Sequence, residues 1–219
     1  MAKEEHTGSA VSGPPIAFKF LGGRICLDFN NTVDWQDDWR DGGLIAERLR
    51  SFADLAAWGA AAGILTAGEA DALLQAAAQR PAEADAALNK AIRLRRAVHT
   101  VFSAAARGER VDAAELDELN TWVSEAFASA QLVPKADGFA WGWKTSPSAL
   151  ELPLWAVAKS AAELLTSAGL SRVGECMSHG CGWLFFDTSR NGSRQWCEMK
   201  VCGNRAKARR HYEKTKFRV

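Results

Sequence analysis

Four of the five cysteines of this chain lie close together near its C-terminal end. They form two pairs with the spacing C-x4-C-x15-C-x4-C, first Cys176 and Cys181 and then Cys197 and Cys202. Four thiolates make a tetrahedral ligand set, and the chain between the pairs is long enough to fold back and bring them together. The pattern therefore predicts one structural Zn²⁺ ion with no open coordination position, and the spacing alone leaves iron as the alternative.

A glycine follows the second cysteine of each pair, at Gly182 and Gly203. Glycine lets the backbone turn sharply, so that amide N–H groups can approach the sulfur atoms. His179, between the first two cysteines, is expected at the exposed tip of its turn rather than as a ligand. The fifth cysteine, Cys26, is expected to be a small buried apolar residue in a strand-like run.

The chain after the second cysteine pair is strongly basic, and residues 203–214 are expected to form a helix. Lysine and arginine neutralise phosphates and release counterions, and guanidinium groups can also read base edges. Ala208 and Tyr212 form a narrow stripe that could dock on the cysteine turns. A helix that stays solvated, or that docks on the acidic body of the same chain, is the alternative to nucleic-acid binding. The candidate nucleic-acid contacts are Arg190, Arg194, Lys200, Arg205, Lys207, Arg209, Arg210 and Lys214.

The formal net charge of +1, from 27 basic and 26 acidic residues, hides a strong asymmetry. Residues 171–219 carry eleven basic and four acidic side chains, a net charge of +7, and the preceding 170 residues carry a net charge of −6. Four thiolates and one Zn²⁺ would lower the charge of the C-terminal part to about +5. This segregation points to an anion-binding region beside a solvating body.

The composition of the 219 residues, 47% hydrophobic and 24% charged, is that of a globular protein. A single tyrosine and abundant alanine favour helix over an all-β fold. No apolar run is long enough to span a membrane, and the first fifteen residues lack a signal-peptide core. We therefore expect a cytoplasmic protein without a membrane partner.

The body is expected to be mainly helical, with short hairpins. Residues 18–29 predict two strands around Gly22 and Gly23, and residues 132–145 predict a second hairpin. Thr66 and Glu69 form a predicted capping box, Asp112 a predicted cap, and Gly169 the predicted end of the last helix. The expected helices span 44–62, 66–79, 81–106, 112–127 and 153–167.

The cysteine region is expected to form a small zinc-ribbon-like module followed by the basic helix. The apolar run 183–186 predicts a hairpin strand whose side chains cover the metal, and Trp196 is expected in the same small core. Asp187 is expected to cap the polar turn that follows. So small a module depends on its metal for folding. The expected division of the chain is a tail at 1–15, an α-rich domain at 16–170 and a zinc module at 171–219.

Two stretches of this sequence resemble known families. The run RQWCEMKVCGNRAK at 194–207 resembles the signature of the CGNR zinc-finger family, and CGWLFFD at 181–187 resembles its first turn and strand. The run GGRICLDFNNT at 22–32 resembles the start of the ABATE domain that accompanies this finger. The resemblance implies a bacterial stress-induced transcription regulator with a DNA-binding finger, and all four ligand positions are cysteine here.

Together these observations favour a DNA-binding regulator, associated with the nucleoid, that uses a structural zinc finger and a basic helix. RNA binding through the same surface is one alternative. Another is a helical domain that senses a small molecule, with the zinc module serving protein interaction; a homodimer is also considered. No nucleotide-binding loop, metalloprotease motif or nucleophile elbow is present in the sequence, so we do not expect an enzyme.

Overall fold

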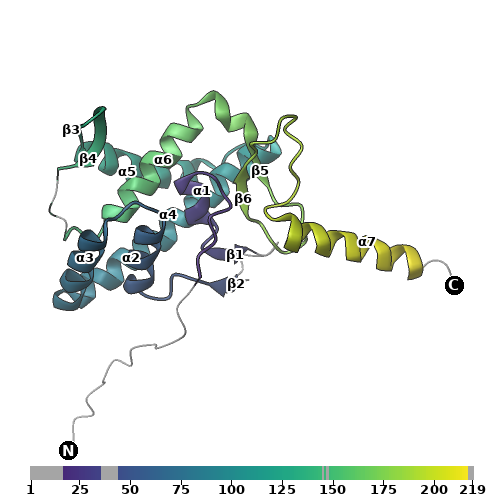
Figure 1. The fold of residues 1–219 in the computed structure, drawn as a ribbon, viewed down its shortest axis with the longest axis horizontal. Coiled ribbons are helices and arrows are strands. Elements are labelled where there is room, and N and C mark those ends of the chain that lie inside the picture. Colours follow the sequence, from purple (N-terminus) through teal and green to yellow (C-terminus); the bar gives the residue numbers. More distant parts are fainter. Residues whose placement is uncertain (1–16, 36–43, 145, 147, 217–219) are drawn as a thin grey trace, which may run out of the picture.

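The computed structural model describes residues 17–35, 44–144, 146 and 148–216. Helices form one body, and the last helix projects away from it, at the opposite end from the β3–β4 hairpin (Figure 1). The helices are α1 (Ile25–Asn30), α2 (Phe52–Ala61), α3 (Ala67–Gln79), α4 (Pro81–Arg107), α5 (Ala113–Ser129), α6 (Leu152–Leu165) and α7 (Asn204–Lys216). A short 3₁₀ turn (Ala168–Arg172) follows α6, and a π turn (Met199–Gly203) precedes α7.

The described strands form three separate antiparallel pairs. They are β1 (Val33–Trp35) with β2 (Leu44–Glu47), β3 (Ala130–Lys135) with β4 (Gly138–Trp143), and β5 (Val173–Glu175) with β6 (Leu184–Phe186). The expected fold class is thereby confirmed: a mainly helical chain with small hairpins and a C-terminal four-cysteine cluster followed by a helix. Among the described helices, none combines the length and the apolar character that crossing a bilayer requires.

The body is organised around α4, which packs against α1, α2, α3, α5 and α6. Helix α4 begins at Pro81, as predicted, because the first turn of a helix needs no N–H group from this residue. Gly108 ends it in a left-handed conformation with φ of 67°. The predicted caps of its neighbours are confirmed: Thr66 and Glu69 form a capping box on α3, and Asp112 caps α5. The hairpin expected at 132–145 is also present, as β3 and β4.

The prediction of two strands within 18–29 is wrong, because residues 25–30 form helix α1. The chain before this helix folds back onto its first turn: the carboxylate of Asp28 accepts a hydrogen bond from Gly22 N–H at 2.7 Å. A side chain at Gly22 would lie 2.7 Å from the backbone nitrogen of Asp28, so only glycine allows this approach. Cys26 is fully buried as expected, on a helix rather than a strand.

The prediction of one helix over 44–62 is wrong in its first part. Residues 44–47 form β2, and the helix begins only at Phe52, where the Ser51 hydroxyl accepts from Asp54 N–H. A tertiary interaction explains the strand: Glu47, at its end, forms an ion pair with Arg95 of α4, whose side chain is 1% exposed. The unpaired Arg95 charge would be costly to bury, so this contact outweighs local helix propensity.

Gly169 does not end the last body helix as predicted. Helix α6 ends at Leu165, and the hydroxyl groups of Thr166 and Ser167 bond back to the carbonyls of Ala162 and Leu164. Gly169 lies instead in the 3₁₀ turn. The boundary expected near residue 170 stays a prediction, and the tail at 1–15 lies outside the described residues. Apolar side chains beyond residue 170, at Val173 and Leu184, belong to the main core.

Candidate metal centre and basic helix

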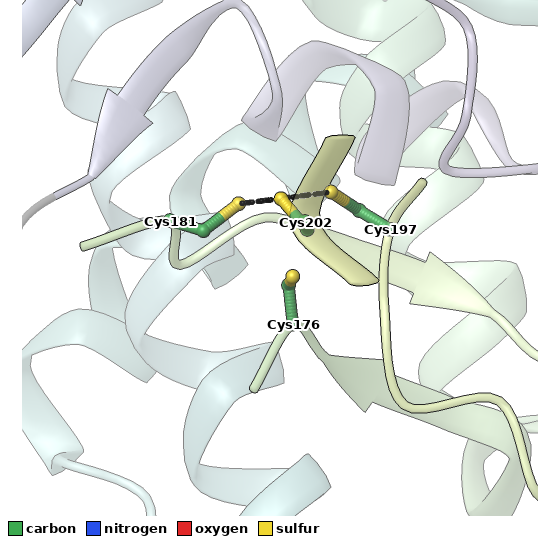
Figure 2. A group of neighbouring side chains, drawn as sticks. All are labelled: Cys176, Cys181, Cys197 and Cys202. Atoms are coloured by element: carbon green, nitrogen blue, oxygen red, sulfur yellow. Dashed lines mark hydrogen bonds between the residues drawn. The ribbon is translucent and has the colours of Figure 1, made fainter. Parts of the chain in front are cut away.

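The four paired cysteines converge on one point, as Figure 2 shows. Cys176 follows β5, and Cys202 lies in the π turn before α7. Their four Sγ atoms all lie within 4.8 Å of one another. The three separations among Cys181, Cys197 and Cys202 are 3.5, 3.6 and 3.7 Å. A tetrahedral ion with bonds of about 2.3 Å to sulfur separates its ligands by about 3.8 Å, so the cluster fits Zn²⁺.

In the first cysteine turn, each sulfur accepts a hydrogen bond from the backbone N–H two residues further along the chain. The Cys176 sulfur accepts from the N–H of Ser178, and the Cys181 sulfur accepts from the N–H of Trp183. Gly182 makes the second approach possible: its φ is 60°, and a side chain there would lie 2.5 Å from the Cβ atom of Trp35. Such N–H donors orient thiolates and disperse their charge. The role expected for Gly182 therefore has a geometric basis.

The ionisation of the cluster shows why it needs a cation. Hydrogen bonds from Cys181 and Cys197 hold the pKa of the Cys176 thiol low, at about 2. In turn, the side chain of Cys176 raises the pKa values of the Cys181 and Cys197 thiols well above their usual range. Sulfurs this close cannot all carry negative charge without a positive ion among them. A bound Zn²⁺ would supply that charge and hold all four as thiolates.

A small apolar cluster covers the cysteines and joins them to the N-terminal part of the chain. Trp183 and Phe185 pack against Cys176, Cys197 and Cys202, and Trp196 is half-buried beside them, as expected. Leu184, between the first two, points instead into the main core. Val33 and Trp35 complete the cluster, and neither was predicted from the sequence. No spacing signal links these two residues to the cysteines, because the contact is purely tertiary.

Trp35 connects the cysteine cluster to the helical body. Its ring stacks on His99 of α4 with centroids 3.8 Å apart, and its Nε1–H donates to the carbonyl of Asn30. His99 in turn contacts the Asn30 side chain at 3.1 Å. The Trp183 Nε1–H donates to the Val33 carbonyl at 2.9 Å. The cysteine module is therefore packed onto the body rather than tethered to it.

The polar turn between the cysteine pairs is fixed from within. Asp187 accepts from the N–H groups of Ser189 and Arg194, which confirms its expected capping role. A hydrogen bond with the Ser189 side chain, followed by the backbone hydrogen bond from Arg194, lowers the pKa of the Asp187 carboxyl. His179 is exposed at the tip of the first turn, also as expected.

The structure separates Arg194 from the other candidate nucleic-acid contacts. Its guanidinium donates to the backbone carbonyls of Trp196, Leu21 and Cys197, and it lies 4.3 Å from the ring centre of Phe185. Through these hydrogen bonds, Arg194 joins the segment around Cys197 to the N-terminal segment at Leu21. The other seven candidates are exposed: Arg190, Lys200, Arg205, Lys207, Arg209, Arg210 and Lys214.

Helix α7 does not dock on the cysteine turns or on the body. The expectation of a docking stripe is wrong, since Ala208 is exposed and Tyr212 is 67% exposed. The helix continues directly from the π turn that contains Cys202, and this connection directs it outward (Figure 1). Among its residues with described side chains, only Ala206 is half-buried. Its cations are therefore accessible from almost every side.

Two family models match the chain. Residues 23–168 match the ABATE family, described as "Putative stress-induced transcription regulator", and residues 172–215 match the CGNR zinc finger. Neither is a family of enzymatic domains. No curated protein matches this chain.

Proposed function

This chain belongs to the ABATE family and carries a CGNR zinc finger, and on that premise we propose that it is a DNA-binding transcription regulator. One observation carries the proposal: a helix rich in cations leaves the four-cysteine cluster directly and stays exposed along its length. The cations of such a helix would be attracted to the acidic body, yet the helix projects away from it. This arrangement favours an external polyanion as its partner.

The metal in this proposal is a single structural Zn²⁺ ion held by Cys176, Cys181, Cys197 and Cys202. When bound, the ion supplies bonds to four sulfurs and so fixes the two cysteine turns relative to each other. Cys202 lies two residues before Asn204, the first residue of α7, so this constraint also sets the direction of the helix. The protein residues then do the binding, through guanidinium and ammonium groups that contact phosphates.

Reversal of the charges of Arg205, Arg209 and Arg210 tests this function. The variant should bind duplex DNA more weakly, and its slope of log K against log salt should flatten by about 0.9 for each phosphate that the helix no longer neutralises. Reversal of Arg96, Arg110 and Lys135, which are exposed on the body, is the matched control and should leave the slope unchanged. Equal slopes for all three proteins would refute DNA binding by α7.

RNA binding through the same surface is the alternative, because aromatic side chains near a zinc module can stack unpaired bases. Trp196 is half-buried, and Tyr212 is 67% exposed. Competition of duplex DNA against single-stranded RNA for the same protein separates the two functions. We expect the duplex to be the better competitor.

The sensing part of the proposed regulator is assigned to a hollow of about 540 Å³ in the body. Trp141 and Trp143 of β4, Ile25 of α1 and Ile64 line it. Its charged lining residues are Arg24, Asp28 and the ion pair of Lys159 with Glu163. Mixed aromatic and charged walls of this size suit a small molecule. A compound that binds there should raise the melting temperature of the wild-type protein but not that of a Trp141→Ala variant. The homodimer stays a prediction, which sedimentation of the full chain would test.

A further inference from the structure

A second hollow lies between the first cysteine turn and α7, and it has a volume of about 480 Å³. One wall is formed by the helix, through Arg205, Arg209 and Arg210. The facing wall is formed by Met177, Ser178, His179, Gln195 and Trp196. His179 and Gln195 are its exposed polar residues. The hollow is thus bounded by two parts of the same zinc module, and its donors come from both sides.

The lining residues divide α7 into two faces. At about 100° per residue, Arg205 and Arg209 lie about 40° apart on the side that faces the cysteine turn. Arg210 lies at the edge of that side, about 60° from Lys207. Lys207 and His211 lie on the opposite side, and neither lines the hollow. Both are exposed. One helix therefore presents two separate sets of polar side chains, which need not contact the same part of a nucleic acid.

The chemistry of the hollow matches a phosphate group. Arginine presents planar, paired donors that fit phosphate oxygens, and three arginines converge on this one space. One carboxylate also lines it: Glu213 forms an ion pair with Arg209 at 3.1 Å. The hollow still has a net positive charge, because Arg205 and Arg210 have no carboxylate partner among the ion pairs found in the described residues. Its volume is within the range of about 300–1,000 Å³ that binding sites occupy.

We propose that this hollow holds the sugar-phosphate backbone of one DNA strand, so that Lys207 and His211 on the opposite face of α7 lie toward the base edges. The inference rests on the proposed function and assigns its contacts. The face of α7 toward the cysteine turn should therefore determine the affinity for any duplex. The opposite face should determine the sequence preference.

The first experiment compares Arg209→Ala with Lys207→Ala, each of which removes one positive charge from exposed helix. The probe is a pool of DNA duplexes with a randomised central segment, from which bound molecules are recovered and sequenced. Arg209→Ala should weaken binding to the whole pool by roughly tenfold, reduce the salt slope by about 0.9, and leave the recovered base frequencies unchanged. Lys207→Ala should change the base frequencies.

A second pair of variants tests the wall that is not helical. Gln195→Glu places a carboxylate beside the proposed phosphate, and Asn191→Asp places one on an exposed turn of the same module outside the hollow. Gln195→Glu should lower affinity for the pool, and Asn191→Asp should not. Glu213→Gln should raise it. Zinc content and circular dichroism of each variant establish that the module is folded.

The outcomes separate this inference from the proposed function. If the wild-type protein binds no duplex, both are overturned. If it binds the pool, but Arg209→Ala and Gln195→Glu bind like wild type, the assignment of the backbone to this hollow is overturned and DNA binding stands. If single-stranded RNA displaces the pool at lower concentration than duplex DNA does, the hollow holds an unpaired strand and the duplex assignment is wrong.

Discussion

The side-chain amide of Asn31 forms hydrogen bonds to both backbone polar groups of Leu184. Its Nδ2 donates to the Leu184 carbonyl at 2.8 Å, and its Oδ1 accepts from the Leu184 N–H at 3.0 Å. Both residues are almost completely buried, with exposures of 2% and 0%. Asn31 thus occupies the place of a neighbouring strand beside β6, and it joins the N-terminal segment to the chain between the two cysteine pairs.

Replacement of Asn31 by aspartate should destabilise the protein, because the donor to the Leu184 carbonyl is removed and a carboxylate is buried beside it. We expect the free energy of unfolding to fall by about 1–3 kcal/mol in urea titration. The control is Asn120→Asp on the exposed surface of α5, which should change it by less than about 0.5 kcal/mol. Equal stability of the two variants would show that the Asn31 hydrogen bonds contribute nothing.

The cysteines should differ sharply in their effect on metal content. Purified wild-type protein should contain one zinc ion per chain, and Cys202→Ser should lose it because one of four thiolate ligands is missing. Cys26→Ala should keep it, since Cys26 is buried elsewhere and burial raises the pKa of its thiol to about 12. Elemental analysis measures this directly. Zinc retained by Cys202→Ser, or iron in the wild-type protein, would contradict the assignment.

Arg194 should behave as a structural residue. Lysine cannot reproduce the donor pattern with which Arg194 binds the carbonyls of Trp196, Leu21 and Cys197. We therefore expect Arg194→Lys to lower the free energy of unfolding by about 1–3 kcal/mol, although the charge is unchanged. Arg190→Lys, on the exposed part of the same turn, is the control and should have wild-type stability. If the two variants unfold alike, the hydrogen bonds of Arg194 are not stabilising.

Asp28 should make stability fall as the pH rises. Burial raises the pKa of this carboxyl from 3.8 to about 6, against the hydrogen bonds from Gly22 and Gly23. Because its pKa is higher in the folded state, the folded protein binds more protons, and the stability contributed by protonated Asp28 is lost between about pH 4 and pH 6. Asp28→Asn should remove this part of the pH dependence. Urea unfolding of both proteins across the range in which this stability is lost measures the difference, and parallel curves would contradict it.

The parts of the fold that follow from the sequence are those whose signals are local. The Thr66–Glu69 capping box, the cap at Asp112 and the proline at the start of α4 depend on side chains within a few residues of the backbone they stabilise. The cysteine cluster could also be predicted, because two closely spaced cysteine pairs are the spacing typical of one metal site.

The parts that could not be predicted depend on contacts between distant residues. Residues 44–47 became a strand because Glu47 pairs with Arg95, 48 residues further along the chain. Residues 25–30 became a helix whose first turn bonds back to Gly22 through Asp28. Nothing in the sequence pattern places Trp35 on the cysteines, because that contact joins segments that are far apart in the chain. The outward direction of α7 could not be predicted either, since Ala208 and Tyr212 form an apolar stripe that could have packed on the cysteine turns.

The most direct test of the central claim measures duplex DNA binding before and after zinc removal, using the full chain and a labelled duplex. We expect a chelator to abolish binding, one equivalent of Zn²⁺ to restore it, and the helical body to retain its α-helical circular dichroism throughout. Metal-free protein that binds the duplex as tightly as the zinc-loaded form would contradict the claim that the four-cysteine site holds α7 in position for DNA.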